Sequence, residues 1–231
     1  MSNIKIQNIN KSVSSIIINE PKAYNSLSFK NLNDLIKAFD KLNVSKSTKV
    51  IIIEGSGPGF SAGHNLKEVR GLKSKSKYQK LFNLCSKLMI KIVEGRKPVI
   101  AKVHGAAFAA GCQLVASCDL AYSTNDAKFA TPGVNIGLFC STPMVAVSRK
   151  VSRKKMMKML LTGDPINAKY AKEIGLINDH FSKSKLNKEV LKIANLIASK
   201  SNLTIKIGKQ AFYKQLELSL IHISEPTRPS S

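Results

Sequence analysis

Small residues fill the stretch VHGAAFAAGCQLVASCD, which runs from Val103 to Asp119. An apolar run leads into a turn of glycine and alanine, and an apolar segment of helical character follows the turn. Backbone N–H groups of such a turn, at the start of a helix, can hydrogen-bond a developing oxyanion. Chemistry of this kind usually also needs a side chain that moves a proton. The stretch carries no acid before Asp119, so the sequence predicts an anion-stabilising turn without a carboxylate inside it.

His104, His180, Asp119 and the cysteines show no spacing that is typical of a catalytic or metal-binding site. His104 precedes the small-residue turn and is expected to be structural, and His180 has no partner visible in the sequence. Asp119 ends the helical segment, where we expect it to accept hydrogen bonds from backbone donors. No CxxC or other metal-ligand spacing occurs among the four cysteines, which we expect to be reduced, structural thiols: Cys85, Cys112, Cys118 and Cys140.

Strands and helices alternate along the chain and must position these residues. Residue types typical of strands occupy 4–9, 12–19, 49–55, 98–105, 119–123 and 128–132. Ser28 can cap a helix through 31–42, and apolar residues at three-four spacing predict a second helix over 74–95. Further helices are expected at 111–117, from about 142, over 153–161 and over 167–175. The alternation predicts an α/β fold.

Length and composition indicate one globular domain. The chain has 231 residues, of which 43% are hydrophobic, enough for one sizeable core. No window approaches the roughly 20 consecutive apolar residues that a membrane span requires. The first residues show neither a signal-peptide core nor an Arg-rich transit segment. The sequence therefore predicts a soluble domain with no visible targeting segment.

The formal net charge of +23 raises the possibility of a nucleic-acid partner. Only five of the 37 basic residues are arginine, the residue that bidentate phosphate and base recognition favours. The lysines are spread along the whole chain rather than gathered in one stripe. We therefore do not expect a dedicated nucleic-acid site, although a positive surface would attract a small ligand that carries phosphates.

Four ordered motifs resemble the enoyl-CoA hydratase/isomerase (crotonase) superfamily over residues from about 13 to 216. They are INEPKAYNSLS, VIIIEGSGPGFSAGHNLKEV, KPVIAKVHGAAFAAGCQLVASCDLAYSTNDAKFATPGVNIGLF and LTGDPINAKYAKEIGLI. The resemblance implies a spiral of ββα units that assembles as a homotrimer or hexamer. It also implies mitochondrial residence, with a cytoplasmic location as the alternative because no presequence is visible. The implied ligand is an acyl-CoA, with coenzyme A as part of that ligand and no permanently bound cofactor.

The resemblance assigns roles to individual residues. The oxyanion donors would be the backbone N–H groups of His64, in SAGHN, and of Ala110, in FAAGC. The segments that match the family's coenzyme A contacts contain Lys22, Ala23, Asn25, His64, Asn65, Leu66 and Lys67. Lys22 and Lys67 would face phosphate charge, the alternative being that both are ordinary solvated lysines.

The two glutamates that hydratases of the family use are missing from the matching positions. Gln113 and Gly133 stand there instead. Glutamine can hydrogen-bond a water but cannot take its proton, and glycine offers no side chain. General acid–base groups contribute about 10²–10⁴-fold each, so we expect weak or no hydratase activity. His64 and Cys140 are the nearest replacement candidates, with structural roles as their alternatives.

Two classes of function follow from these residues. The first is an acyl-CoA-binding protein of fatty acid metabolism, either with little turnover or catalysing another thioester-enolate reaction such as decarboxylation or isomerisation. The second is a non-enzymatic regulatory or RNA-binding protein that keeps the fold. The sequence does not decide whether the chain is an enzyme.

The last residues, 218–231, differ in kind from the predicted domain over 1–217. LSLIHISEPTR, Leu218 to Arg228, can be encoded without a mismatch by a transposase adaptor used to prepare sequencing libraries. We therefore expect this tail to derive from the adaptor, and the helical segment that normally closes the family's fold to be truncated. Sequencing the gene from genomic DNA should replace the tail by an apolar-periodic helical continuation, and finding the same tail there would contradict this expectation.

Overall fold

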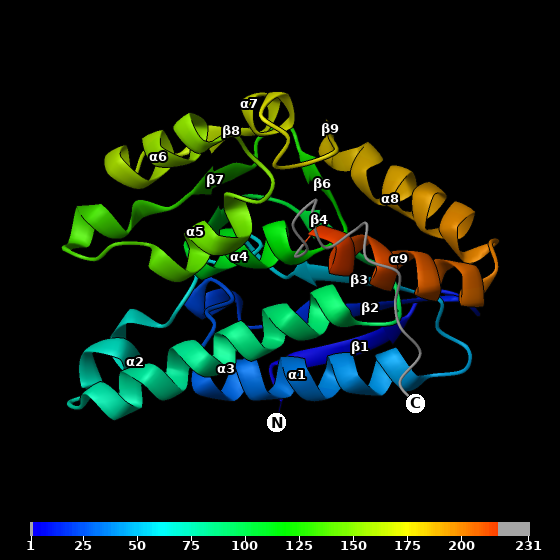
Figure 1. Ribbon diagram of the computed structural model, residues 1–231, viewed down its shortest axis with the longest axis horizontal. Helices are drawn as coiled ribbons and strands as arrows, with labels where there is room; N and C mark the ends of the chain where they lie inside the picture. Colours follow the sequence, from blue (N-terminus) through cyan, green and yellow to red (C-terminus); the bar gives the residue numbers. More distant parts are fainter. Residues whose placement is uncertain (1, 217–231) are drawn as a thin grey trace, which may run out of the picture.

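The computed structural model describes residues 2–216, which form two sheets with helices around them (Figure 1). The larger sheet has six strands in the order β1 (Ile4–Asn8), β2 (Val13–Ile18), β3 (Val50–Gly55), β4 (Val99–Val103), β6 (Leu120–Thr124) and β9 (Asp179–Phe181). β1 pairs antiparallel with β2, and every other pairing in this sheet is parallel. The smaller sheet contains β5 (Ala106–Phe108), β7 (Lys128–Ala130) and β8 (Ile166–Asn167).

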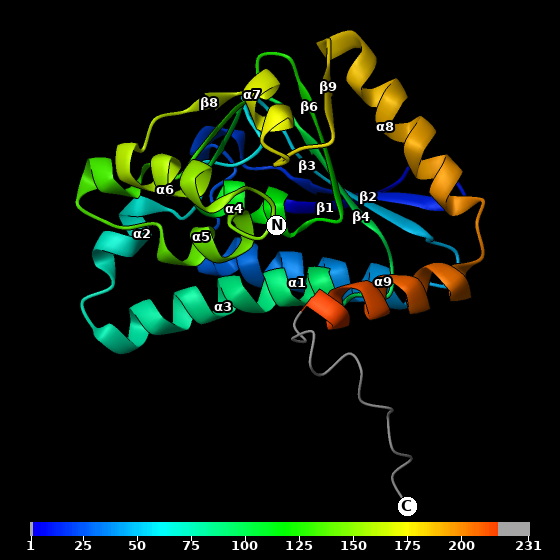
Figure 2. The same cartoon turned by 45° about the horizontal axis from the view of Figure 1, so that its top comes forward.

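Helices cover both faces of the larger sheet. α1 (Phe29–Val44) and α3 (Lys75–Glu94) lie side by side on one face, and α8 (Lys183–Ala198) covers the other (Figures 1 and 2). The remaining helices are α2 (Leu66–Gly71), α4 (Ala110–Ser117), α5 (Ser141–Val147), α6 (Arg153–Thr162), α7 (Ala168–Glu173) and α9 (Asn202–Leu216), with short 3₁₀ helices η1 (Pro21–Ala23) and η2 (Pro132–Ile136). The predicted α/β fold is confirmed.

The strand β3 is buried on both faces, as expected for a parallel sheet between two layers of helices. Ile51 and Ile53 pack into the larger hydrophobic core, which includes residues of α1 and α3. Val50 and Ile52 alternate with them and join a second core that contains Val190 of α8. The alternation explains why the sequence VIIIEG is almost continuously apolar, and it holds the carboxyl end of β3 at a fixed place.

Local sequence patterns predicted several of the helices and strands but gave no prediction for others. Ser28 caps α1 as predicted, because its Oγ accepts a hydrogen bond from the N–H of Asn31 at 3.2 Å. Sequence reasoning assigned no element to the residues of β5, α2, α8 or α9. α8 carries an apolar residue every four positions in its second half, at Val190, Ala194 and Ala198, and that spacing would have identified it.

The last described helix, α9, is attached to the sheet by a buried polar cluster around Asp119. Asp119 accepts hydrogen bonds from Val99 N–H at 2.7 Å, from Lys209 Nζ at 2.7 Å and from Tyr213 Oη at 2.9 Å. Lys209 also donates to the carbonyls of Ile92 and Lys97, at 2.8 and 2.9 Å. Asp119 thus accepts a backbone donor, as predicted, and in addition binds two side chains from a helix 90 residues away in sequence.

The predicted tail at 218–231 lies outside the described residues. Within residues 2–216, none of the helices combines the length and the apolar character needed to cross a bilayer.

We predict that Lys209→Met destabilises the fold by about 3 kcal/mol, because it leaves the Asp119 carboxylate in a largely buried position without its cation. The Lys209 side chain is only 6% exposed and that of Asp119 17%. The free energy of unfolding, measured by urea titration, is the readout. Lys214→Met on the exposed side of the same helix is the matched control and should change stability by no more than about 0.5 kcal/mol. Equal effects of the two changes would contradict the buried role of Lys209.

Candidate functional site

The predicted site residues lie where two neighbouring parallel strands end. β3 ends at Gly55 and β4 at Val103, and β3 pairs with β4 along their length. The two loops that follow these strands hydrogen-bond to each other: Ser61 N–H donates to the Ala106 carbonyl at 3.0 Å, and Phe108 N–H donates to the Ser61 carbonyl at 2.9 Å. The sequence segments that contain SAGHN and FAAGC are therefore adjacent in space.

Two glycines let these loops approach more closely than side chains would allow. A Cβ on Gly111 would lie 2.3 Å from the carbonyl oxygen of Ser61. A Cβ on Gly63 would lie 2.9 Å from the carbonyl oxygen of Phe108 and 3.1 Å from the backbone nitrogen of Ala110. Gly63 also has φ at +89°, in the left-handed region that L side chains rarely adopt. The residue after it, His64, is thereby held next to the first turn of α4.

Ala109, which precedes α4, has an unusual backbone conformation. Its φ is 48° and its ψ is −117°, a combination that normally requires glycine. Its N–H donates to the Ala130 carbonyl at 2.9 Å, and its own carbonyl accepts from Gln113 N–H at 3.0 Å. A residue in such a region stores about 1–3 kcal/mol of strain and is often found at functional sites. The turn directs the N–H of Ala110 out of the start of the helix.

The N–H groups of His64 and Ala110 are both without a hydrogen-bond acceptor among residues 2–216. An N–H group of this kind needs an acceptor from solvent or from a ligand. The one on Ala110 also lies at the positive end of the α4 helix dipole. The two donors therefore belong to segments in contact, and each needs an acceptor from outside the described chain.

The side chain of His64 is held away from solvent. Its Nδ1 lies 3.0 Å from the Leu27 carbonyl, and its ring meets Phe82 edge to face at 5.4 Å between centroids. Nε2 is buried without a hydrogen-bond partner in the described chain. Burial lowers the pKa of the imidazole below its usual value of 6.5, although the Leu27 contact partly offsets that effect. The imidazole is therefore neutral near pH 7.

The segments predicted to contact coenzyme A meet beside this turn. Ala62 N–H donates to the Tyr24 carbonyl at 3.0 Å, and Leu27 N–H donates to the Gly63 carbonyl at 2.7 Å. These bonds join the segment around Tyr24 and Leu27 to the residues that directly precede His64; that the two segments contact coenzyme A stays a prediction. Within residues 22–25 and 64–67, Ala23, His64 and Asn65 are partly buried, and the exposed residues are Lys22, Tyr24, Leu66 and Lys67.

Two of the predicted contact residues have their side chains occupied by the fold. Asn25 is fully buried: its Oδ1 accepts from Glu20 N–H at 2.9 Å, and its Nδ2 donates to the carbonyls of Ser56 and Gly59, both at 2.7 Å. Asn65 caps α2, accepting from Lys67 N–H at 3.0 Å and from Glu68 N–H at 3.2 Å. Both asparagines therefore position the loops, and Lys22 and Lys67 supply the exposed charge.

Gln113 lies on α4 and Gly133 on the 3₁₀ helix η2. Gln113 is 4% exposed, and its Oε1 accepts a hydrogen bond from the thiol of Cys85 at 3.9 Å. Gly133 donates its N–H to Cys140 Sγ at 3.3 Å. A Cβ on Gly133 would lie 2.9 Å from the Leu138 carbonyl oxygen and 3.0 Å from Cys140 Sγ, so any side chain there must displace its neighbours.

None of the four cysteines is placed as a ready nucleophile. All are free and buried. Burial raises the pKa of the Cys140 thiol, and it raises the pKa of both Cys85 and Cys112 to about 12. A thiol rather than a thiolate is present at neutral pH, which matches the expectation of structural cysteines.

The other two histidines among residues 2–216 make structural contacts. His104 Nε2 lies 2.9 Å from the Gly57 carbonyl, as expected for a residue that fixes the turn. His180 Nδ1 lies 2.8 Å from Asn125 Oδ1, a partner that the sequence did not reveal.

Sequence reasoning also missed Ser61, which is buried and whose Oγ donates to the Asn25 carbonyl at 2.8 Å and accepts from Gly63 N–H at 3.2 Å. Its place between two loop glycines was the available signal.

Comparison with known proteins gives consistent matches. Residues 8–227 match the family model described as Enoyl-CoA hydratase/isomerase. The human protein "Enoyl-CoA hydratase domain-containing protein 3, mitochondrial" is 45% identical over 208 residues, which are 90% of this chain and 69% of that protein. "Enoyl-CoA hydratase, mitochondrial" of Pongo abelii is 32% identical over 212 residues, 91% of this chain and 72% of that protein.

Solved structures agree with these matches. A crystal structure titled as enoyl-CoA hydratase of Mycobacterium smegmatis superposes with a TM-score of 0.93 at 41% identity and covers 96% of this chain and 86% of that chain. The crystal structure of human enoyl coenzyme A hydratase domain-containing protein 3 gives a TM-score of 0.92 at 43% identity, over 95% of this chain and 87% of that chain.

We predict that His64 makes stability depend on pH. Because burial lowers its pKa in the folded state, the unfolded chain binds a proton more readily, so the free energy of unfolding should fall as the pH drops below 6.5. Urea titrations at about pH 7.5 and about pH 5.5 should show that His64→Asn, which can still donate to the Leu27 carbonyl, loses stability less steeply on acidification than the wild type does. The same pH dependence in both proteins would contradict a buried, neutral His64.

Proposed function

Because the chain belongs to the enoyl-CoA hydratase/isomerase family, we propose that it binds the acyl thioester of coenzyme A at the turn between His64 and Ala110. The thioester oxygen would accept hydrogen bonds from the N–H groups of these two residues. The observation that carries the proposal is that both donors lack an acceptor in the described chain while their segments are in contact. The names of the relatives support the choice of ligand.

Such an arrangement stabilises negative charge on the thioester oxygen. The donors belong to the backbone and are held by the sheet, so they need no reorganisation when charge develops. One donor of this kind is worth about 2.7–4 kcal/mol of transition-state stabilisation in enzymes from which it has been removed. The dipole of α4 acts in the same direction. The site would therefore favour any reaction that passes through a thioester enolate.

We further propose that hydration of an enoyl thioester is weak or absent. Addition of water requires groups that take and deliver a proton, and Gln113 and Gly133 can do neither. The two replacement candidates do not fill the gap. The ring of His64 contacts the Leu27 carbonyl and Phe82, and Cys140 carries a thiol whose pKa is raised by burial.

Decarboxylation of a 2-carboxyacyl thioester is the second candidate. Loss of CO₂ leaves the electron pair of the broken C–C bond on the α-carbon, which generates the enolate without a base. Two anion-binding donors and no acid at the hydratase positions favour this reaction over hydration. Isomerisation instead requires a base that removes a proton from the α-carbon, so the residues present favour it less than decarboxylation.

The assembly, compartment and cofactor use remain predictions that follow from the family. A homotrimer or hexamer is expected, and mitochondrial residence is supported by the names of human and rat relatives that are 45% and 44% identical to this chain. Coenzyme A would enter only as part of the acyl-CoA. The non-enzymatic alternative with RNA as a partner predicts binding that falls steeply with salt and does not compete with acyl-CoA.

We predict that the wild-type protein binds crotonyl-CoA but hydrates it barely above the uncatalysed rate. Gln113→Glu combined with Gly133→Glu should raise the rate by more than the product of the two single changes, because two carboxylates must act on one water. Binding is measured by calorimetry and hydration by loss of the enoyl absorbance. Decarboxylation, the second candidate, is tested by incubating the wild-type protein with malonyl-CoA and measuring the CO₂ released.

The controls separate chemistry from folding. Gly133→Ala carries the same Cβ into the crowded position beside Cys140 without a carboxyl group, so it measures the steric cost by its melting temperature. Rapid hydration by the wild type would refute the argument from the missing acids. A double mutant that melts like Gly133→Ala but gains no activity would show that these two positions are not the acid positions.

A further inference from the structure

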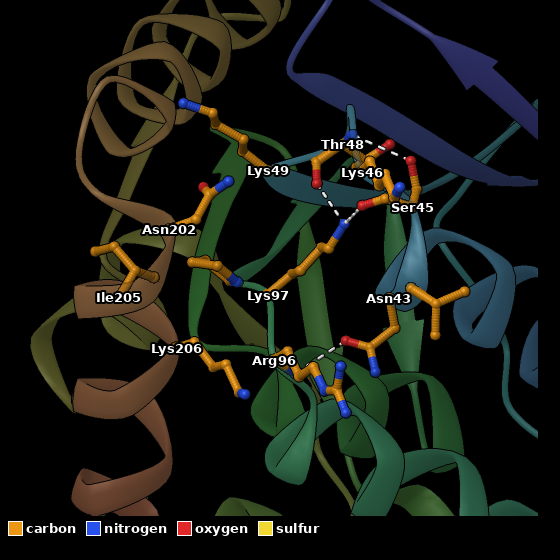
Figure 3. A pocket seen from close by; sticks show the side chains of 12 residues that line it. Asn43, Ser45, Lys46, Thr48, Lys49, Arg96, Lys97, Asn202, Ile205 and Lys206 are labelled. Atoms are coloured by element: carbon orange, nitrogen blue, oxygen red, sulfur yellow. Dashed lines mark hydrogen bonds between the residues drawn. The ribbon is translucent and has the colours of Figure 1, made fainter.

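A basic hollow of about 260 Å³ opens between three segments that are distant in sequence (Figure 3). Its walls are the loop between α1 and β3, the residues that join α3 to β4, and the first turns of α9. Five of the twelve residues that line it carry a cationic side chain, and none carries an acidic one: the cations are Lys46, Lys49, Arg96, Lys97 and Lys206. We name this feature the basic hollow.

The positive charges of the basic hollow are not compensated within residues 2–216. Lys97 Nζ donates to the carbonyls of Ser45 and Thr48, and Lys49 Nζ donates to the Ala198 carbonyl at 3.0 Å, but carbonyls carry no net charge. The ion pairs of the described chain include none of the five cations. Lys206 extends from α9 towards Arg96 in Figure 3. Like charges held together in this way repel each other, and a bound anion would relieve the repulsion.

Two further features favour an anion in the same place. Asn202 and Ile205, from the first turn of the 15-residue helix α9, line the basic hollow, and the N–H groups at this end of a helix carry partial positive charge. The last residues of α1 line it as well, and there the Ser45 carbonyl is already bonded to Lys97. Lys97 is partly buried, and this burial lowers the pKa of its ammonium group. A neighbouring anion would favour the charged form of Lys97 again.

The basic hollow is separate from the predicted thioester site. Apart from the three on α9, its residues directly precede β3 or β4, whereas the His64 and Ala110 loops follow these strands. β3 has six residues, so the two sites lie at opposite ends of strands about 20 Å long. In both ribbon views α2, which follows His64, and α9 lie at opposite ends of the molecule.

We propose that the basic hollow binds the linked phosphates of a diphosphate or of a longer phosphate chain. Arg96 offers a planar fork that suits phosphate oxygens, and the ammonium groups of Lys46 and Lys206 supply point charges on either side. These three cations carry more positive charge than the roughly two negative charges of a single phosphate would balance. No aromatic ring lines the basic hollow, so a base or other planar group of the ligand would have no stacking partner and would remain outside. The site goes beyond the proposed thioester chemistry and does not depend on it.

Calorimetric titration of the full chain with inorganic pyrophosphate at low ionic strength tests the proposal. Arg96→Gln combined with Lys206→Gln should weaken binding about tenfold or more, since both lost cations line the same hollow. Lys154→Gln combined with Lys169→Gln removes the same charge from exposed positions on α6 and α7, outside both the basic hollow and the predicted coenzyme A segments, and should change the affinity by less than about twofold. Orthophosphate should bind more weakly than pyrophosphate.

Three results would overturn the proposal. They are absence of pyrophosphate binding by the wild type, equal weakening by the two double mutants, and orthophosphate binding as tight as that of pyrophosphate. A single-stranded RNA that binds more tightly than pyrophosphate and is displaced by it would assign the surface to nucleic acid instead. Melting curves check that each variant is folded. Lys46→Gln combined with Arg96→Gln replaces the first pair if the change at Lys206 disturbs α9, and the same weakening is then expected.

Discussion

The close contact between the backbone at Gly63 and the backbone at Ala110 is the constraint on which the site depends. It requires a residue without a side chain at Gly63 and again at Gly111, where a Cβ would lie 2.3 Å from the Ser61 carbonyl oxygen. It also holds Ala109 in a conformation that alanine rarely adopts. Such strain persists only where the surroundings determine the backbone fully. Here the hydrogen bonds between the two loops, together with the bond from Ala109 to Ala130, do so.

The rest of the fold keeps that contact in place. β3 and β4 are buried on both faces and deliver the two loops to the same edge of the sheet. Asn25 and Ser61 use buried polar groups to join the segment after β2 to the loop after β3. Asp119 joins the far end of α4 to the start of β4 and to α9. Polar groups with buried partners therefore appear on both sides of the site, where apolar packing alone would fix the loops less tightly.

Sequence reasoning succeeded where the signal was local. The apolar runs of β3 and β4, the cap at Ser28 and the glycine–alanine turn each follow from a few adjacent residues. It failed where the partners are distant: nothing near Asp119 indicates Lys209 or Tyr213, and the basic hollow combines three segments that only the fold brings together. Asn25 was expected to contact a ligand because of its motif, whereas its amide group is used inside the protein. The roles of His64, Ala110, Gln113 and Gly133 in binding and catalysis stay predictions.

The central claim is that two backbone donors bind a thioester oxygen at a site that cannot hydrate the bound substrate. One NMR experiment on ¹⁵N-labelled protein with crotonyl-CoA tests both parts in the same sample. The account predicts that the amide protons of His64 and Ala110 shift downfield on binding, because both form new hydrogen bonds, while the alkene signals of crotonyl-CoA persist. Rapid loss of the alkene signals, or saturable binding that leaves both amide protons unshifted, would contradict it.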